Sequence, residues 1–173
     1  MDSERLRAVQ APIKDRYRAE PEAALITLKA SGSIDDQDGV SCSVETGRAL
    51  VKAGLHPATG GDGMLVCSGD MLLQALVACA GVTLRAVATA KGIEVRGGSV
   101  NAEGDLDFRG TLGVDREAPV GFKNIRLRFD LDVDASPEDI ASLQKLTERY
   151  CVVYQTLASG VKPEIEFQTV SHR

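Results

Sequence analysis

The chain lacks an excess of positive charge. Its 173 residues include 20 Lys and Arg against 25 Asp and Glu, which gives a net charge of −5, and the basic residues are scattered along the sequence. Proteins that bind nucleic acid usually gather their basic residues into a patch or stripe, so we do not expect a nucleic-acid partner. The length fits a single domain that can bury a core of its own.

A secretory signal and a long uncharged stretch are also missing. The start of the chain carries no apolar segment, and the longest uncharged part of its most apolar region covers only residues 71–84. This is too short to span a bilayer. The four cysteines are therefore expected in a reducing compartment, where a disulfide is transient rather than structural. We expect a cytoplasmic protein without a membrane partner.

Histidine is scarce, which limits the kinds of site that the chain can build. The two histidines are His56, in a loop rich in glycine and proline, and His172, near the C-terminal end. A Cys–His nucleophile pair is therefore not expected, and the cysteine spacing does not match a zinc knuckle. Residues 59–63 are glycine-rich but lack the lysine of a phosphate-binding loop and do not open directly onto a helix. We predict no metal and no cofactor.

Alternation of apolar and polar residues predicts the sheet. Strands are expected at residues 24–29, 40–44, 100–108, 125–133 and 165–169. The two long stretches alternate cleanly, which indicates antiparallel strands with one buried and one solvated face and helices packed on a single side. The predicted class is α+β, in one domain. Residues 1–23 are predicted to form a helical extension, and residues 24–170 the core.

Two helices are predicted from the signals at their ends. Ser68 is expected as the N-cap, and Gly92 as the C-terminal stop, of a strongly apolar helix. Ser136, followed by a proline, opens an amphipathic helix that is expected to end at Gly160. The glycine-rich residues 52–63 are expected to form a loop. Because the apolar helix has only a narrow polar seam, one domain of this size offers it too little cover, and we expect a dimer.

Cys79 and Cys151 are the candidates for chemistry. Cys79 lies in the middle of the apolar helix, on a face of mostly small residues that we expect to be buried, and Cys151 lies at the edge of the apolar stripe of the second helix. A thiol at mid-helix does not benefit from the N-terminus of its own helix, so its reactivity would need a positive group supplied by the fold. The alternative is that both are small buried hydrophobic residues, as free cysteines often are. Cys42 is expected in the core, and Cys67 is expected to pack on Leu72.

The sequence around both cysteines resembles the OsmC/Ohr family, the osmotically inducible and organic-hydroperoxide-resistance proteins. Residues 68–79, SGDMLLQALVAC, are similar to the family's first-cysteine helix, Pro-x-Glu-Leu-Leu-Leu-Ala-Ala-Leu-x-x-Cys. Residues 148–157, ERYCVVYQTL, are similar to its second-cysteine helix, and the order of elements agrees. Ser68 stands where the family has proline, and Asp70 where it has glutamate. We take Asp70 as a partner of the helix dipole rather than as a site residue.

The resemblance implies an α+β fold with antiparallel sheets around two central cysteine-bearing helices, in an intertwined homodimer. It also implies a thiol-dependent peroxidase that reduces organic hydroperoxides in oxidative stress defence and is regenerated by a dithiol. By the same resemblance Cys79 attacks the peroxide, and Cys151 resolves the sulfenic acid as a disulfide. The alternative function is a non-catalytic dimeric module that binds a hydrophobic ligand and uses its cysteines for packing.

One expected feature of the resemblance is missing from the sequence. The hydroperoxide-resistance branch of the family has an arginine in its early strands, and residues 30–33 of this chain contain none. Lys29, Arg48 or Arg149 could replace this missing cation, and the sequence does not choose among them.

Overall fold

The computed structural model describes residues 50–168 except Val114, the strand residues 32–33 and 41–45, and the isolated helical positions Glu4, Ala8, Ala11 and Ala19. Several sequence predictions lie outside these residues. They are the strand at 24–29, most of the N-terminal helical extension, the side chain of Cys42, and His172.

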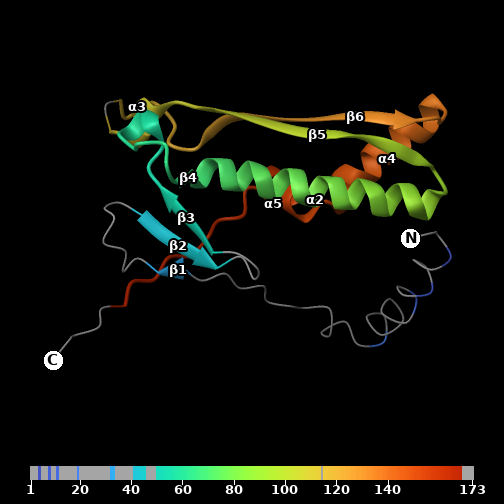
Figure 1. Cartoon of the computed structure of the whole chain (residues 1–173), viewed down its shortest axis with the longest axis horizontal. Helices are drawn as coiled ribbons and strands as arrows, with labels where there is room; N and C mark the ends of the chain where they lie inside the picture. Colours follow the sequence, from blue (N-terminus) through green and yellow to red (C-terminus); the bar gives the residue numbers. More distant parts are fainter. Residues whose placement is uncertain are drawn as a thin grey trace.

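The described part of the chain has the predicted α+β architecture (Figure 1). In order along the chain the elements are β1 (Gly32–Ser33), β2 (Ser41–Glu45), β3 (Leu50–Gly54), the 3-10 turn η2 (Pro57–Thr59), β4 (Val66–Cys67), α2 (Ser68–Lys91), β5 (Val95–Leu106), α3 (Phe108–Thr111), β6 (Phe122–Val133), α4 (Pro137–Tyr150) and α5 (Val152–Ser159). Strands β1 to β4 form one sheet, in which β1, β2 and β3 are antiparallel neighbours and β4 is parallel to β3. Strands β5 and β6 form a separate antiparallel pair.

The long β5–β6 pair provides the surface on which the helices pack. Val100 pairs with Phe129 and Ala102 with Leu127, so that apolar side chains from both strands share one face. Helix α2 packs along β5 and is also in contact with α4 and α5 (Figure 1). The alternation predicted for β6 is confirmed, because its apolar residues are partly buried and the intervening charged ones are exposed.

Helix α2 is buried along a single narrow stripe. Its buried residues, Leu76, Ala80, Leu84 and Ala88, follow one another at intervals of one turn. The prediction that the face centred on Cys79 is buried is therefore wrong, because Cys79 lies beside this stripe and is only half-buried. The N-cap is Cys67 rather than Ser68, and Gly92 ends the helix as predicted, in the left-handed conformation at φ 72°.

The predicted helix from Ser136 to Gly160 is two helices with a break at Cys151. Ser136 caps α4 as predicted, its Oγ accepting a hydrogen bond from Asp139 N at 3.1 Å. Cys151 leaves the helical region at φ −74° and ψ 107°, and it is at once the C-cap of α4 and the N-cap of α5. Gln155 Nε2 donates to the carbonyl oxygen of Glu148 at 2.8 Å, which satisfies an acceptor that the break leaves free.

Two other predictions about secondary structure are wrong. The predicted loop at 52–63 begins three residues too early, because β3 continues to Gly54, and from residue 55 on it contains the turn η2, in which His56 Nδ1 accepts a hydrogen bond from Ala58 N at 3.0 Å. The predicted closing strand is absent from residues 161–168, where Ile165 and Phe167 are 80% and 91% exposed. A strand needs a neighbour for its backbone hydrogen bonds, and the described part of this chain supplies none for that segment.

By length and hydropathy alone, the 24-residue helix α2 could cross a membrane. The length of the uncharged stretch at 71–84 therefore does not by itself exclude a membrane span. In the described part of the chain this helix contacts β5, α4 and α5.

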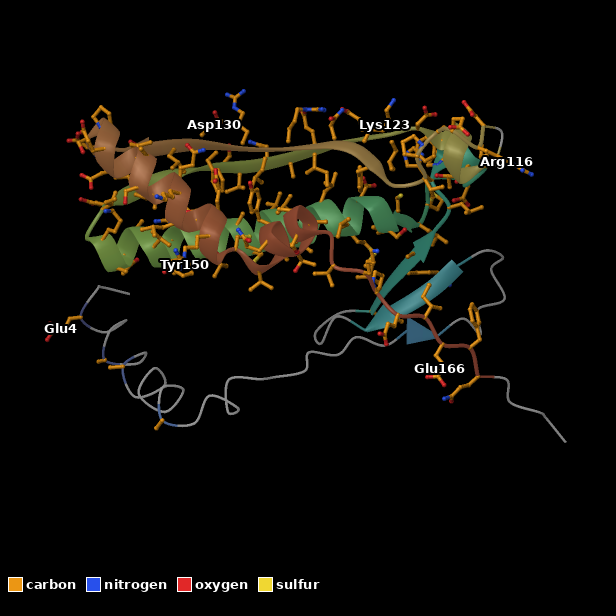
Figure 2. The ribbon with its side chains drawn as sticks, turned by 180° about the vertical axis from the view of Figure 1, so that it is seen from behind. Glu4, Arg116, Lys123, Asp130, Tyr150 and Glu166 are labelled. Atoms are coloured by element: carbon orange, nitrogen blue, oxygen red, sulfur yellow. The ribbon has the colours of Figure 1, made fainter. Side chains whose placement is uncertain are left out.

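Charged residues form ion pairs across the solvated face of the β5–β6 pair. Arg126 contacts both Asp105 and Glu103, and Arg96 contacts Asp132. Figure 2 shows this face turned away from the helices, with Lys123 and Asp130 on it. Hydrogen bonding to Arg126 lowers the pKa of Asp105 to about 2. Because the folded-state pKa lies below the ordinary value of 3.8, the pair contributes stability above that pH, and the contribution is lost as the pH falls toward 2.

We expect the variant Asp105→Asn to be less stable than the wild type at pH 7 and equally stable at pH 2. The effect should be small because the pair is exposed to solvent. Urea unfolding at both pH values measures it, with the exposed Asp134→Asn as the control, for which no ion pair is seen among the described residues. An equal loss at both pH values would contradict the assignment of the effect to the Asp105 carboxylate.

Candidate thiol site at the α4–α5 break

The fold brings Cys79 and Cys151 together. Cys151 is 1% exposed and packs against Leu76 and Ala80 of α2, in a cluster whose partly buried edge includes Cys79. The two thiols lie close enough for each to shift the pKa of the other, and neither forms a disulfide. Cys151 is therefore more buried than the edge position that the sequence predicted, because the helix break turns it inward.

The N-terminus of α5 points toward the Cys79 sulfur. Burial raises the pKa of Cys79, but four neighbouring donor groups together lower it by more. They are the N–H of Val153, the thiol of Cys151, the N–H of Val152 and the hydroxyl of Thr83. The net result is a pKa below the ordinary value for a thiol. Val152 and Val153 are in the first turn of α5, where backbone N–H groups have no partner within the helix. These groups, and the positive end of the helix dipole, favour the thiolate.

Cys151 has the opposite tendency. Burial raises the pKa of its thiol, and the neighbouring Cys79, which takes the negative charge, raises it further. The pair is thus asymmetric, because the Cys79 thiol loses its proton more readily than the Cys151 thiol. Such an arrangement separates a nucleophile from a protonated second thiol.

Among the described residues, the groups that lower the pKa of Cys79 are backbone N–H groups, a thiol and a hydroxyl, and none is a charged side chain. Arg149 Cζ lies 5.6 Å from the ring centroid of Tyr150. In the described part of the chain, no charged group is among the causes that lower the pKa of Cys79. Lys29 and Arg48 lie outside the described residues. In the described part of the chain, the first turn of α5 supplies two of the groups that lower the pKa of Cys79.

The remaining sequence candidates do not join this site. Cys67 is half-buried at the start of α2, and His56 stacks on Phe108 with ring centroids 4.9 Å apart. In the described part of the chain, no group of three or more His, Cys, Asp or Glu is placed to hold a metal. Asp70 lies in the first turn of α2, as predicted for a partner of the helix dipole.

The sequence places Thr83 on the helix face of Cys79 but assigns it no role, and it does not point to the backbone N–H groups of Val152 and Val153. Neither proline nor glycine marks the break before them. The available signal is the pair of β-branched residues directly after Cys151, which lowers helix propensity there. Thr83 follows Cys79 by one helical turn, so its position beside the sulfur could be predicted from helix geometry.

Comparison with known protein families decides where the chain belongs. The model of the OsmC-like protein family matches residues 61–166, which is more than half of the chain and includes both cysteines. The chain belongs to the OsmC-like family. Comparison with curated proteins gives no match.

Solved structures of other OsmC-like proteins share the fold. An OsmC-like protein from Mycoplasma pneumoniae is 20% identical with a TM-score of 0.61, covering 77% of this chain and 89% of its own. An organic hydroperoxide resistance protein from Legionella pneumophila is 18% identical with a TM-score of 0.59, covering 78% and 90%. One from Elizabethkingia anophelis is 14% identical with a TM-score of 0.55, covering 77% and 89%. At these identities the likeness shows a common fold.

Proposed function

We propose that this OsmC-like protein is a thiol-dependent peroxidase that reduces organic hydroperoxides through Cys79 and Cys151 and serves in defence against oxidative stress. The observation that carries the proposal is the contact between the two thiols at the first turn of α5, which lowers the pKa of one and raises the pKa of the other. Family membership and the hydroperoxide resistance proteins among its structural neighbours support the substrate class.

In the first step the Cys79 thiolate attacks the terminal oxygen of the hydroperoxide. A sulfur–oxygen bond forms, the O–O bond breaks, and the alkoxide takes up a proton to leave as an alcohol. Cys79 becomes a sulfenic acid. The N–H groups of Val152 and Val153 stabilise the thiolate before the attack, so a useful fraction of Cys79 is reactive near neutral pH.

In the second step Cys151 attacks the sulfenic sulfur of Cys79. A disulfide forms and water leaves, carrying the oxygen from the sulfenic acid and the proton from Cys151. A dithiol then reduces the disulfide and returns both cysteines to their starting state. Until Cys79 is oxidised, the raised pKa of Cys151 keeps it protonated, which prevents two thiolates from competing for the peroxide.

Activity is tested by following hydroperoxide consumption in the presence of a dithiol. We expect several equivalents of an organic hydroperoxide to be consumed for each chain. Consumption that does not exceed the reaction of the dithiol alone would contradict the proposal, and it would favour the module that binds a hydrophobic ligand.

We also propose that the working form is a homodimer in which a second copy covers the outer face of α2. Val82 on this helix is 72% exposed and Leu72 38%, and Tyr150 and Val152 beside the site are 58% and 68% exposed. These exposed apolar side chains on α2 and beside the site would be shielded from water by a partner. The cysteine site borders this surface, so a partner there would also shield the thiols.

We expect the protein to sediment as a dimer at micromolar concentration, and the variant Val82→Asp to lose the dimer. A carboxylate at this position would be buried without a partner when two copies meet. Val120→Asp is the matched control, because Val120 is 64% exposed and lies in the segment before β6. A wild-type chain that remains a folded monomer, or a Val82→Asp variant that still dimerises, would contradict the proposed interface.

A further inference from the structure

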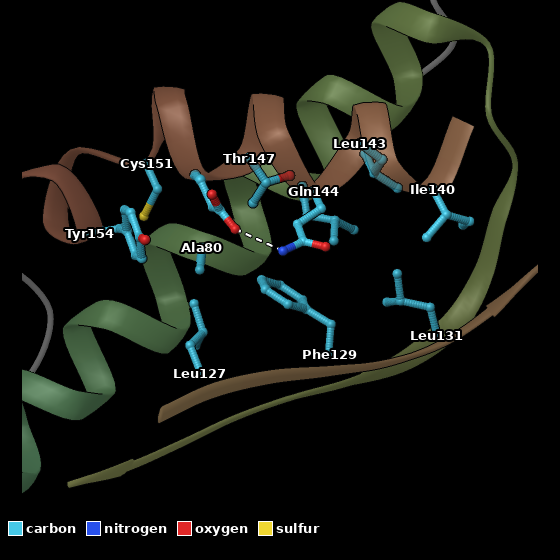
Figure 3. Close-up of a pocket in the computed structure, with 12 residues that line it drawn as sticks. Ala80, Leu127, Phe129, Leu131, Ile140, Leu143, Gln144, Thr147, Cys151 and Tyr154 are labelled. Atoms are coloured by element: carbon cyan, nitrogen blue, oxygen red, sulfur yellow. Dashed lines mark hydrogen bonds between the residues drawn. The ribbon is translucent and has the colours of Figure 1, made fainter. Parts of the chain in front are cut away.

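A cavity of about 310 Å³ lies between α2, α4 and β6 (Figure 3). One wall is apolar and is formed by Leu127, Phe129 and Leu131 of β6, and Leu84 of α2 and Ile140 of α4 extend it. The three β6 side chains are only half-buried, and Ile140 is 36% exposed. The protein therefore leaves part of this apolar surface uncovered, and a hydrocarbon group placed against it would be removed from water.

The side of the cavity formed by α4 also carries polar groups. Gln144, Thr147 and Glu148 all line the cavity. Gln144 Nε2 donates a hydrogen bond to Glu148 Oε1 at 2.9 Å, which is the dashed line in Figure 3. Figure 3 also shows the Gln144 side chain pointing from α4 toward Phe129 on the opposite wall. A neighbour one turn away thus holds the carboxylate of Glu148 at the cavity.

Glu148 is the one charged group among the described residues that line the cavity. It is half-buried, and no ion pair of its carboxylate is seen in the part of the chain that the structure describes. The adjacent Arg149 lies over the ring of Tyr150 instead, with Cζ 5.6 Å from the ring centroid. A carboxylate beside an apolar cavity loses part of its hydration, and a positive charge compensates for that loss. The cavity therefore favours a cationic occupant over a neutral or anionic one.

The polar wall also favours an occupant that donates hydrogen bonds. A carboxylate has about four lone-pair sites on its two oxygens, and Gln144 occupies one of those of Glu148. The side-chain oxygen of Gln144 is a further acceptor. The Thr147 hydroxyl is buried and has no hydrogen-bond partner among the described residues, so the chain by itself leaves this wall incompletely satisfied. A primary ammonium group has N–H donors and no acceptor, and it matches such a wall.

We propose that this cavity binds a small primary alkylammonium ion. The ammonium group contacts the Glu148 carboxylate and the Gln144 side-chain oxygen, and the hydrocarbon body lies along the apolar wall of β6. The inference goes beyond the proposed peroxidase function and does not rest on it, because no reaction of the thiols is invoked and Cys79 is not among the described residues that line the cavity.

Size and polarity set limits on this ligand. Pockets for small molecules have volumes of about 300–1,000 Å³, so a cavity of about 310 Å³ admits a short hydrocarbon chain rather than a bulky ring system. A second ammonium group at the far end of the chain would face the apolar wall without a partner, which disfavours a diamine. Ordered water needs roughly two to four polar partners, and the apolar wall offers it none.

The head group is tested by isothermal titration calorimetry of the full chain at neutral pH. The probes are hexylammonium, hexan-1-ol and hexanoate, which share one chain length. We expect saturable binding of hexylammonium, with hexan-1-ol about tenfold weaker and hexanoate weaker still. Binding of the alcohol as tight as that of the ammonium ion, or no saturable binding of hexylammonium below about 5 mM, would overturn the proposal.

The hydrocarbon body is tested with methylammonium, which carries the same charge without the chain. This probe is needed because the protein has a net charge of −5, so that any ammonium ion also meets acidic groups on the surface. Loss of the apolar contact should weaken binding by about tenfold or more. Equal binding of methylammonium and hexylammonium would show attraction to surface charge alone and would overturn the site.

Two substitutions on α4 test the role of the carboxylate. Glu148→Gln removes the charge but keeps the shape of the side chain, and it should weaken hexylammonium binding about tenfold while leaving the binding of hexan-1-ol unchanged. Glu138→Gln, in the first turn of the same helix and away from the cavity, should change neither. Equal affinities of the two variants for hexylammonium would overturn the assignment of the ammonium group to Glu148.

The place of binding can be read from the leucine methyl groups by NMR, without any substitution. Hexylammonium should shift the methyl resonances of Leu127, Leu131 and Leu143, which line the cavity. Leu112, which follows α3 and is 54% exposed, does not line it and should not shift. Shifts that spare the three cavity leucines would overturn the site.

Cys79→Ser separates this inference from the proposed function. Hydroperoxide consumption should be lost in this variant, whereas its affinity for hexylammonium should equal that of the wild type. Loss of hexylammonium binding in Cys79→Ser would overturn the placement of the ligand apart from Cys79. If the wild type consumes hydroperoxide but does not bind hexylammonium, only the inference about the cavity fails, and the peroxidase proposal stands.

Discussion

Replacing Cys79 with serine is expected to abolish hydroperoxide consumption. A hydroxyl group is a far weaker nucleophile than the thiolate that the α5 N-terminus stabilises, and Cys151, with its raised pKa and deep burial, cannot take over the attack. The measurement is the loss of an organic hydroperoxide with time, in the presence of a dithiol. Activity retained in Cys79→Ser would show that another group reacts first.

Cys151→Ser should behave differently from Cys79→Ser. Attack at Cys79 remains possible, so we expect one equivalent of hydroperoxide to be consumed rapidly and a sulfenic acid to accumulate on Cys79. Capture of that acid with dimedone identifies it by mass. Cys67→Ser is the matched control, because Cys67 is a free cysteine that lies apart from the pair. Equal effects of the Cys67 and Cys151 substitutions would contradict the proposed roles.

Removing one backbone donor from the site is the second change with a large expected effect. Val152 is the first residue of α5, a position where proline is tolerated because its missing N–H has no partner in the helix. Cys151, at φ −74° and ψ 107°, already has the extended conformation preferred before proline. Val152→Pro therefore deletes a hydrogen bond to the Cys79 thiolate while the helix is kept.

A hydrogen bond to a charged group contributes about 1.5–3 kcal/mol, so we expect Val152→Pro to react with hydroperoxide roughly tenfold more slowly at neutral pH. The direction of the change in the Cys79 pKa follows from the loss of a donor that stabilises the thiolate. The wild-type Cys79 ionises at a pH below that of an ordinary thiol, and the variant should need a higher pH to form the same fraction of thiolate. Thiolate absorbance near 240 nm, followed against pH, measures this.

Val152→Ala is the control for that experiment, since it shortens the side chain but keeps the N–H. Its titration should match the wild type. If Val152→Pro and Val152→Ala titrate alike, the N–H of Val152 is not among the groups that lower the pKa of Cys79.

The sequence predicts the elements that depend on local pattern. The alternation in residues 125–133 corresponds closely to β6, because one face of this strand is covered by helices and the other by water. Gly92 and Ser136 mark helix ends because a left-handed residue and a side-chain cap are local requirements.

The features that the sequence does not predict depend on tertiary contacts. The buried stripe of α2 is one helical position away from the expected face, since α4 and β5, rather than the size of the side chains, decide which side is covered. The break at Cys151 is stabilised by Gln155 Nε2, seven residues beyond Glu148, and this interaction is not visible in a periodic pattern.

The candidate site illustrates the same division. Sequence motifs suffice to select Cys79 and Cys151. Among the groups that lower the pKa of Cys79 are the backbone N–H groups of Val152 and Val153. Every residue except proline has such a group, so the sequence does not identify them. A sequence comparison that looks for the missing arginine considers side chains alone and not backbone N–H groups. Among the described residues, the first turn of the short helix α5 supplies backbone donors to Cys79.

Mass spectrometry of the protein after one equivalent of an organic hydroperoxide tests the central claim most directly. The account predicts a single disulfide between Cys79 and Cys151, with Cys42 and Cys67 remaining as free thiols. A bridge that involves Cys42 or Cys67, or four unmodified thiols after excess hydroperoxide, would contradict it and leave the ligand-binding module as the better explanation.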